Sequence, residues 1–255
     1  MRTKSPTLFS APQVQLWFMD TRLLTPPNVQ QILSTLSPDE VRTQARIHHP
    51  LRRSEYLGSR YLLRNLLTQT LSEHPPQRWR IGKTPPGKPA LMDLAETFNV
   101  DFSLSHSGGI SICALGVGCQ VGVDIELRDP TVHWSELAEH ALSDMEVEDL
   151  KKKVGPAQVE RLFEYWTLKE AALKALATGL LSQVKNISFR IIPCSDGSRS
   201  KIIRADFHDE CPSTQERWEF HTFNVKNTFQ GALAVRHDFR TPLKLYSAEL
   251  KEIAF

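Results

Sequence analysis

The clearest helical pattern in the chain is centred on Phe163-Glu164-Tyr165-Trp166-Thr167-Leu168-Lys169-Glu170-Ala171-Ala172-Leu173-Lys174. Apolar residues recur there every three or four positions, which predicts a helix over Gln158–Ala177 with one apolar stripe, stopped by Gly179. Glu170 falls inside that stripe. Because an unpaired buried charge is costly, its carboxylate should meet a metal ion, a basic group or a solvated cleft.

Two interpretations of Glu170 follow from its neighbours. Glu170 and Lys174 are spaced i,i+4 in the favourable orientation, so a plain ion pair would account for both charges. Alternatively, carboxylates beside the ammonium groups of Lys169 and Lys174 suit a magnesium ion that bridges phosphate oxygens, because the metal neutralises carboxylates while lysines hold phosphate.

A strand-like run around Cys119–Ile125 adds Asp124 and Glu126 on one face, because side chains alternate along a strand. The two carboxylates would lie roughly 6.6 Å apart along the strand, close enough to share one cation or its water shell. A solvent-wetted face of a half-buried strand gives the same alternation. The pattern alone is therefore compatible with both interpretations.

The turn Ser105-His106-Ser107-Gly108-Gly109 combines small hydroxyls, a histidine and two glycines after a predicted strand. Glycines let backbone N–H groups approach an anion closely, so the turn is a candidate phosphate contact. A lone histidine in a turn is also typical of an ordinary surface position.

The first part of the chain alternates between strand-like and helical patterns. Val14–Phe18 alternates as a strand does, and Ser37-Pro38-Asp39-Glu40 is a capping box that opens a helical region reaching Leu67. Pro50 is expected to interrupt this region. Pro75–Pro89 is rich in proline, so we expect an irregular segment there.

The second part predicts further strands and short helices. An antiparallel meander is expected over Phe102–Leu104, Ile110–Val117 and Cys119–Ile125, followed by short helices over Trp134–Lys153. Later strands are expected at Ile187–Ile192, Lys201–Phe207, Trp218–Val225 and Ala232–Val235. The fold class is therefore α+β, divided near Gly118 into halves of residues 1–118 and 119–255.

The composition is that of an ordinary globular protein. Its 255 residues are 40% hydrophobic and 24% charged, which excludes collagen, a disordered tail and a bilayer-spanning bundle. A net charge of +2 gives no bulk attraction to nucleic acid, and no apolar run approaches the roughly 18 residues of a membrane span. The four cysteines form no CxxC pair, so we expect free thiols and a reducing, cytoplasmic location.

Four motifs follow one another between Gly87 and about Leu180. They are Gly87-Lys88-Pro89, Phe102–Gly108, Val121–Glu126 and Phe163–Lys174. In this order they resemble the motif set of the Sfp-type 4′-phosphopantetheinyl transferases. The resemblance implies two pseudo-symmetric α/β halves with the active site in the cleft between them. It also implies magnesium-dependent transfer of the 4′-phosphopantetheine arm of coenzyme A to a serine of an apo-acyl or peptidyl carrier protein, which releases adenosine 3′,5′-bisphosphate.

The resemblance assigns the metal and the chemistry to a small set of residues. Asp124, Glu126 and Glu170 match metal-binding carboxylates. Glu170 also matches the group that takes the proton from the acceptor serine. Lys174 matches the lysine that protonates or stabilises the departing phosphate. Glu146 matches a further glutamate near the metal.

Coenzyme A contacts are implied for a second set. They are Lys88, Ser105, His106, Lys169 and Lys174, with His106 near the 3′-phosphate. Trp166 matches the tryptophan of the last motif, although core packing would explain its place on the apolar stripe equally well.

One departure from the family pattern concerns the nucleotide phosphate. Many relatives carry an arginine four residues before the glycine that Gly58 matches, and this chain has Ser54 there. We expect Arg52 or Arg53 to reach the phosphate instead. Two solvated surface arginines are the alternative.

Two other functions use similar residues. A magnesium-dependent nuclease also needs paired carboxylates, but such enzymes commonly place a lysine two residues after the strand carboxylate, and Glu126 is followed by Leu127 and Arg128. A non-catalytic coenzyme A-binding module would not need Glu170 and Lys174. A chain with two halves needs no second copy to complete a cleft, so we expect a monomer.

Overall fold

The computed structural model divides the chain into two compact units. It describes residues 13–71, 74–84, 87–92, 99–131, 134–177, 181–193, 201–208, 217–238 and 250–255. Unit 1 comprises Met1–Val121 with His237–Phe255, and unit 2 comprises Gly122–Arg236. The last segment of the chain thus joins unit 1, which the sequence pattern did not indicate. None of the described helices combines the length and the apolar character needed to cross a bilayer.

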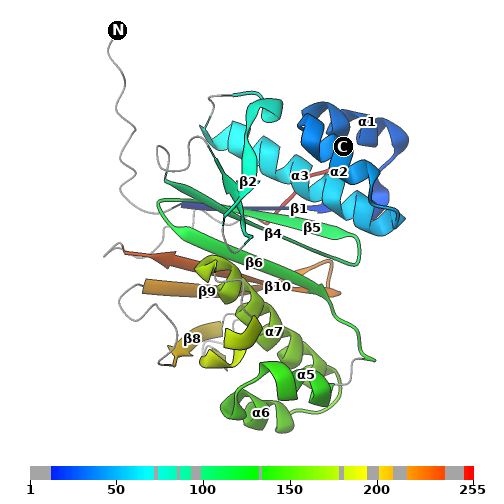
Figure 1. The fold of residues 1–255 in the computed structure, drawn as a ribbon. Coiled ribbons are helices and arrows are strands. Elements are labelled where there is room, and N and C mark those ends of the chain that lie inside the picture. The colour runs from blue at the N-terminus through cyan, green and yellow to red at the C-terminus, as the bar shows by residue number, and fades with distance from the viewer. Residues whose placement is uncertain are drawn as a thin grey trace. The chain divides into compact units, whose positions relative to one another are not determined.

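Unit 1 is built on a sheet with the strand order β11-β1-β5-β4, of which Figure 1 labels β1, β5 and β4. β1 (Gln13–Asp20) and β4 (Val100–Ser107) both pair antiparallel with β5 (Ile110–Val117). The short strand β11 (Lys251–Glu252) pairs parallel with β1. The structure confirms the strands that the sequence predicts in the segments of β1, β4 and β5.

The predicted meander is wrong in its third strand. β6 (Gln120–Leu127) lies in another sheet, beside β10 (Phe229–His237), and not beside β5. The reason is that β1 and β4 already pair with both edges of β5, so no edge is left for β6.

The helices of unit 1 follow the start signals in the sequence. α1 (Pro26–Thr35) and α2 (Pro38–Ala45) precede the long α3 (Pro50–Leu71), which contacts β1, β4 and β5 and runs across one face of the sheet in Figure 1. The predicted capping box at Ser37 and Glu40 is present at the start of α2. The predicted interruption at Pro50 is present, because Pro50 is the first residue of α3. At that position the backbone N–H of a helix has no intrahelical acceptor, so the missing N–H of proline costs no hydrogen bond.

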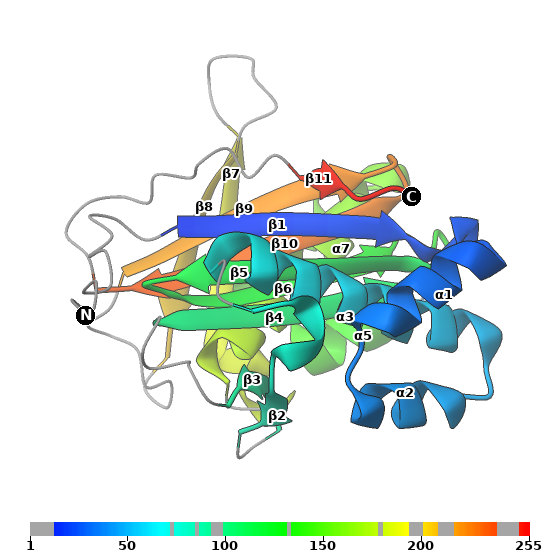
Figure 2. The same ribbon diagram turned by 90° about the horizontal axis from the view of Figure 1, so that it is seen from above.

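The segment between α3 and β4 is more ordered than its prolines suggest. It contains η2 (Pro76–Arg78) and an antiparallel hairpin of β2 (Ile81–Lys83) and β3 (Pro89–Leu91), seen in Figure 2. Burial of Leu91, paired with Ile81, supplies apolar contact that outweighs the turn preference of the prolines. The expectation of an irregular segment is therefore wrong for these two strands.

Unit 2 contains a sheet with the order β6-β10-β9, a separate antiparallel hairpin and several helices. β9 (Arg217–Val225), β7 (Ile187–Pro193) and β8 (Lys201–Phe207) confirm the strands predicted there. The helices of unit 2 are α5 (Trp134–Ala141), α6 (Asp144–Lys151) and α7 (Pro156–Leu176), followed by the short 3₁₀ turn η3 (Leu181–Asn186). Unit 1 also contains one such turn, η1 (Thr21–Leu23).

α7 is the predicted central helix, and its apolar stripe forms the core of unit 2. Leu162, Leu168 and Leu173 are buried there among strand residues such as Ile187 and Phe189. The helix ends at Ala177, which adopts the left-handed conformation at φ +55°. The expected stop at Gly179 lies outside the described residues.

Candidate active site

The contact between β6 and α7 places the candidate catalytic residues of unit 2. Gly122 on β6 packs directly against the backbone of α7, where a Cβ would clash with the Ala171 carbonyl oxygen and lie 2.6 Å from the Ala175 nitrogen. A glycine is therefore required at this crossing. Asp124 follows two residues later on the same strand face and is carried to the same helix.

We expect Gly122→Ala to destabilise unit 2 by more than the ~1–3 kcal/mol of ordinary overpacking, because the obstacle is backbone rather than a movable side chain. Chemical denaturation measures the change in the free energy of unfolding. Gly82→Ala is the matched control, since its Cβ would meet only the flexible end of Met92. Equal stability losses in both variants would contradict the tight β6–α7 crossing.

Lys174 is bonded to Asp124, not to Glu170 as the helix spacing suggested. Its Nζ donates to Asp124 Oδ1 at 2.7 Å and to the Val123 carbonyl oxygen at 3.1 Å. The Asp124 side chain is only 4% exposed and that of Lys174 is 29% exposed. A positive and a negative group thus meet at the edge of the buried region, with the ammonium still reachable from solvent.

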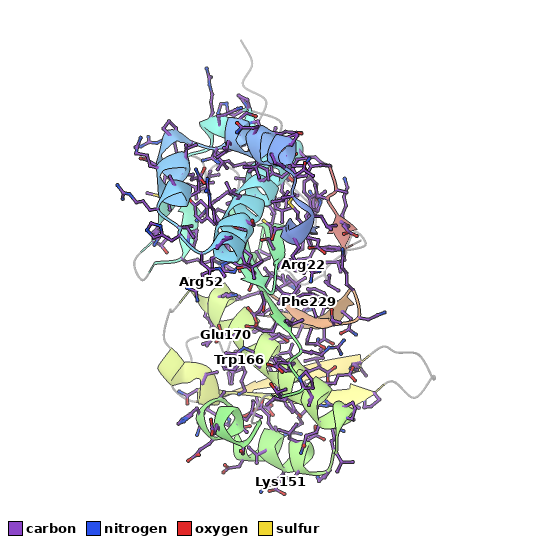
Figure 3. The ribbon with its side chains drawn as sticks, turned by 90° about the vertical axis from the view of Figure 1, so that its right-hand side faces the viewer. Arg22, Arg52, Lys151, Trp166, Glu170 and Phe229 are labelled. Carbon is purple, nitrogen blue, oxygen red and sulfur yellow. The ribbon has the colours of Figure 1, made fainter. Side chains whose placement is uncertain are left out.

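Glu170 lies one turn before Lys174 on α7, and Figure 3 shows it beside Trp166 along that helix. Its Oε1 is buried and has no hydrogen-bond partner among the described residues. Burial raises the pKa of Glu170, the nearby Asp124 carboxylate raises it further, and Lys174 opposes both effects. The site therefore holds a carboxylate poised to take a proton or to accept a cation.

Glu126 is half-buried on β6, two residues beyond Asp124. Within the described ranges, no group of three or more histidine, cysteine, aspartate or glutamate side chains has a metal-binding arrangement. The structure thus brings Asp124 and Glu170 within electrostatic reach of each other. The place of Glu126 beside them stays a prediction.

Lys169 and Glu146 form a fully buried ion pair in the core of unit 2. Lys169 Nζ lies 2.9 Å from Glu146 Oε2 and donates to the carbonyl oxygens of Val184 at 3.0 Å and Ile187 at 2.5 Å. Burial lowers the pKa of Lys169, which Glu146 counteracts. Both side chains are 0% exposed, so this ammonium has no surface to offer a nucleotide.

Glu146 is occupied by the protein on both of its oxygens. Oε2 accepts from the Ser143 backbone N–H at 2.8 Å in a capping box, and Oε1 accepts from the Phe189 N–H at 2.8 Å. Trp166 packs against the hydrophobic core of unit 2. We therefore assign Lys169, Glu146 and Trp166 to the framework that holds α7 in place.

Lys88 of unit 1 is held by the chain itself. Its Nζ lies 2.6 Å from Asp101 Oδ2 and 3.2 Å from the Val121 carbonyl oxygen, and Asp101 Oδ2 also accepts from the Val121 N–H at 2.8 Å. The Lys88 side chain is mostly buried, at 13% exposed. Its ammonium is thus fixed at the start of β6.

His106 and Ser105 lie at the end of β4, as the sequence predicted. Ser105 is buried, whereas the His106 side chain is 48% exposed. Its Nδ1 lies 3.1 Å from Oε2 of Glu55, a buried glutamate on α3 that sequence reasoning missed. The signal was present, because Glu55 falls on the same helix stripe as Ser59, Leu62 and Leu66, all buried.

Arg52 and Arg53 lie exposed in the first turn of α3, where Figure 3 labels Arg52. The Nε of Arg53 donates to Gln44 Oε1 at 2.7 Å, which fixes that guanidinium against α2. Among the described residues, the Arg52 side chain has no hydrogen bond or ion pair of this kind, and the helix spacing places it one turn before Glu55. Arg52 is thus the more adaptable of the two.

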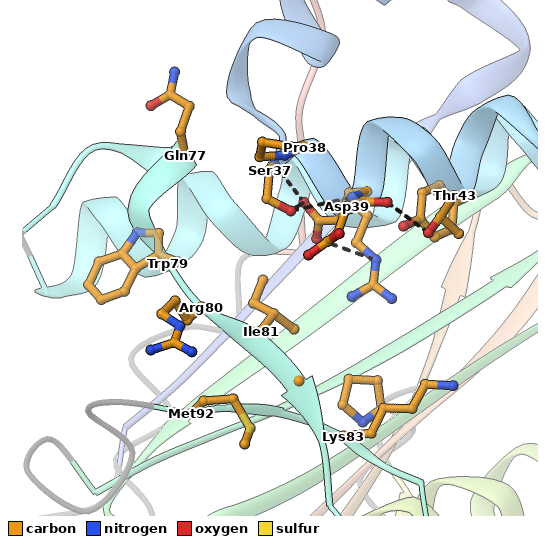
Figure 4. Close-up of a pocket in the computed structure, with 15 residues that line it drawn as sticks. Ser37, Pro38, Asp39, Thr43, Gln77, Trp79, Arg80, Ile81, Lys83 and Met92 are labelled. Carbon is orange, nitrogen blue, oxygen red and sulfur yellow. Dashed lines mark hydrogen bonds and ion pairs between the residues drawn. The ribbon is translucent and has the colours of Figure 1, made fainter.

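A cavity of about 730 Å³ opens in unit 1 between α2, α3 and the β2–β3 hairpin (Figure 4). Its lining is mixed in charge, with Arg60, Arg80, Lys83, Asp39 and Glu40. Lys88, Ser105 and His106 do not line it. This cavity and the expected coenzyme A contacts are therefore separate features of unit 1.

Comparison with known proteins points to one family. The family model of the 4′-phosphopantetheinyl transferase superfamily matches residues 120–235. The 4′-phosphopantetheinyl transferase HetI of Nostoc sp. is 32% identical over 165 residues, which cover 65% of this chain and 69% of HetI. Protein slr0495 of Synechocystis sp., which bears the same enzyme name provisionally, is 31% identical over 169 residues, or 66% and 67% of the two chains.

A third relative extends the likeness over nearly the whole chain. The 4′-phosphopantetheinyl transferase Sfp of Bacillus subtilis is 27% identical over 233 residues, which cover 91% of this chain and 96% of Sfp. The matched region includes both the β6–α7 site and the β4–β5 turn. The chain belongs to the 4′-phosphopantetheinyl transferase superfamily.

Proposed function

We propose that this protein transfers the 4′-phosphopantetheine arm of coenzyme A to a serine of an apo-acyl or peptidyl carrier protein, as a holo-acyl-carrier-protein synthase does. The observation that carries the proposal is the grouping of Glu170, Lys174 and Asp124 at the β6–α7 crossing. Family membership supplies the reaction class, and these residues supply the chemistry it needs.

The proposed step is a substitution at phosphorus. The serine oxygen of the carrier bonds to the phosphorus nearest the pantetheine, and the bond from that phosphorus to the bridging oxygen breaks. Glu170 takes the serine proton, which suits a carboxylate whose pKa is raised by burial and by Asp124. The Lys174 ammonium stabilises the charge on the departing adenosine 3′,5′-bisphosphate.

The residues present fit a magnesium ion. A buried carboxylate oxygen of Glu170 without a hydrogen-bond partner in the described chain, next to a second carboxylate, is a donor set that a hard divalent cation satisfies. Asp124 and Glu170 would hold the ion, with Glu126 as the third predicted ligand. When bound, magnesium would neutralise pyrophosphate charge.

The remaining predicted contacts belong to the donor. Lys88, Ser105 and His106, with Arg52 or Arg53, would bind coenzyme A, and a monomer working in the cytoplasm is the form we propose. Cys113 and Cys119 are buried and carry reduced thiols, which are compatible with a reducing compartment.

The direct test is intact mass spectrometry of apo-acyl and apo-peptidyl carrier proteins incubated with the protein, coenzyme A and magnesium. We expect a phosphopantetheine mass gain on at least one carrier, abolished by EDTA and restored by magnesium. Absence of any gain, while a known transferase modifies the same carriers, would contradict the proposal. Hydrolysis of coenzyme A without carrier modification would favour the alternative of a magnesium-dependent hydrolase of the nuclease type.

A further inference from the structure

The buried carboxylate of Glu55 uses one oxygen on the turn between β4 and β5 and the other on His106, near the end of β4. Oε1 accepts from the Gly109 backbone N–H at 2.8 Å, and Oε2 lies 3.1 Å from His106 Nδ1. Glu55 is 4% exposed, so neither contact is replaceable by bulk water. Because burying a carboxylate costs free energy, packing alone does not explain why a glutamate occupies this position.

The turn itself is already fixed without the imidazole. Gly108 and Gly109 have φ values of +53° and +88°, the pair of positive angles that a two-residue hairpin turn requires. The Gly109 carbonyl oxygen accepts from both the N–H and the hydroxyl of Thr21, each at 2.8 Å. The additional contribution of Glu55 is its contact with the imidazole ring of His106.

Glu55 is held rigidly on its own side. The close packing of Gly58 against Thr21 and Ser111 presses α3 onto the sheet one turn after Glu55. Ser111 also donates its hydroxyl to the Glu55 carbonyl oxygen at 2.9 Å. The carboxylate therefore sits on a fixed platform and can define where the imidazole lies.

We infer that Glu55 is a positioning residue that orients His106 for recognition of the 3′-phosphate of coenzyme A. The Glu55 carboxylate occupies the Nδ1 side of the ring and leaves Nε2 as the ring atom that can face the ligand. In general, an imidazolium whose Nε2–H faces a phosphate donates a charge-assisted hydrogen bond to one of its oxygens. This inference rests on the proposed function, because coenzyme A is the ligand.

The test compares coenzyme A with dephospho-coenzyme A, which lacks the 3′-phosphate, as donors for the same carrier. Glu55→Gln keeps an acceptor for the Gly109 N–H but removes the negative charge behind the ring. We expect it to lower the preference for coenzyme A, measured as the ratio of kcat/KM values, by about 10-fold, the lower end of the effect found for carboxylates that orient metal-binding histidines. The change should appear in KM for coenzyme A, with kcat and carrier KM retained.

Two further variants make the result specific. His106→Ala should lose the same preference for coenzyme A over dephospho-coenzyme A. The double variant with Glu55→Gln and His106→Ala should lose no more than His106→Ala alone, because Glu55 acts through the imidazole. Ser59→Ala is the structural control. It removes a partly buried hydrogen bond of the same helix, which the Ser59 hydroxyl donates to the Tyr56 carbonyl oxygen at 2.9 Å, away from the turn. It should keep the full preference.

The outcomes separate this inference from the proposed function. If the parent protein transfers from coenzyme A but Glu55→Gln keeps the parental preference, Glu55 serves the turn alone and the inference is overturned. An equal loss in Ser59→Ala would overturn it as well, because any weakening of α3 would then suffice. If the parent transfers from neither donor, the proposed function fails first.

Discussion

Glu170→Gln is expected to lower kcat for carrier modification by about 10²–10⁴-fold, the range that loss of a general base produces. The glutamine keeps the size of the side chain but neither takes a proton nor neutralises a cation. Steady-state kinetics on a modified carrier, with magnesium saturating, measure the loss. Turnover within a factor of a few of the parental value would remove Glu170 from the reaction.

The same substitution is expected to leave the fold intact or strengthen it. The pKa of Glu170 is raised in the folded chain, so its contribution to stability is present below the ordinary carboxyl pKa and is lost as pH rises through the raised value. Glutamine is neutral at every pH and avoids this loss. Denaturation of metal-free protein at acidic and neutral pH should show a weaker pH dependence for the variant, an instance of stability traded for activity.

Lys169→Met is expected to destabilise the protein by about 3–5 kcal/mol, because it leaves the Glu146 charge buried without a partner. The free energy of unfolding from denaturant titration measures the change. Lys151→Met is the control, since Lys151 pairs with Glu148 at 2.9 Å on the surface and its loss should leave the free energy of unfolding nearly unchanged. Figure 3 marks Lys151 at the edge of unit 2.

A comparison within α7 separates framework from chemistry. Lys174→Met, five residues later, should reduce turnover strongly while costing less stability than Lys169→Met, because Lys174 is partly exposed and water can take the place of its ammonium. If Lys169→Met left the stability unchanged and mainly raised KM for coenzyme A, the buried pair would not be the reason for this lysine.

Local patterns in the sequence predicted most helices and strands, because capping boxes, glycines and apolar periodicity act over a few residues. The capping box at Ser37 and the stripe of α7 are such cases. The partner of β6 was not predictable in this way, since it depends on which edges of β5 other strands have already taken. Strand pairing over long sequence distances leaves no local mark.

The candidate site shows the same difference between local patterns, which the sequence reveals, and long-range contacts, which it does not. Glu170, which the pattern places on the apolar stripe, is half-buried in the structure, whereas Lys169 and Lys174 look alike in sequence. Only the fold shows that one ammonium enters the core beside Glu146 and the other meets Asp124 at its edge. Glu55 was missed because its partner His106 lies far along the chain and pairs with it only after α3 packs on the sheet.

The parallel pairing of β11 with β1 has a consequence for synthesis on the ribosome. Beyond β11, Ile253 donates its N–H to the Phe18 carbonyl oxygen at 2.9 Å, and the ring of Phe255 lies 5.1 Å from that of Tyr61. Unit 2 is one continuous segment, whereas unit 1 waits for residues translated after it. At usual elongation rates the interval is on the order of ten seconds, during which the outer edge of β1 lacks its native neighbour. A nascent chain in that interval exposes an unpaired strand edge, so chaperone dependence should be concentrated there.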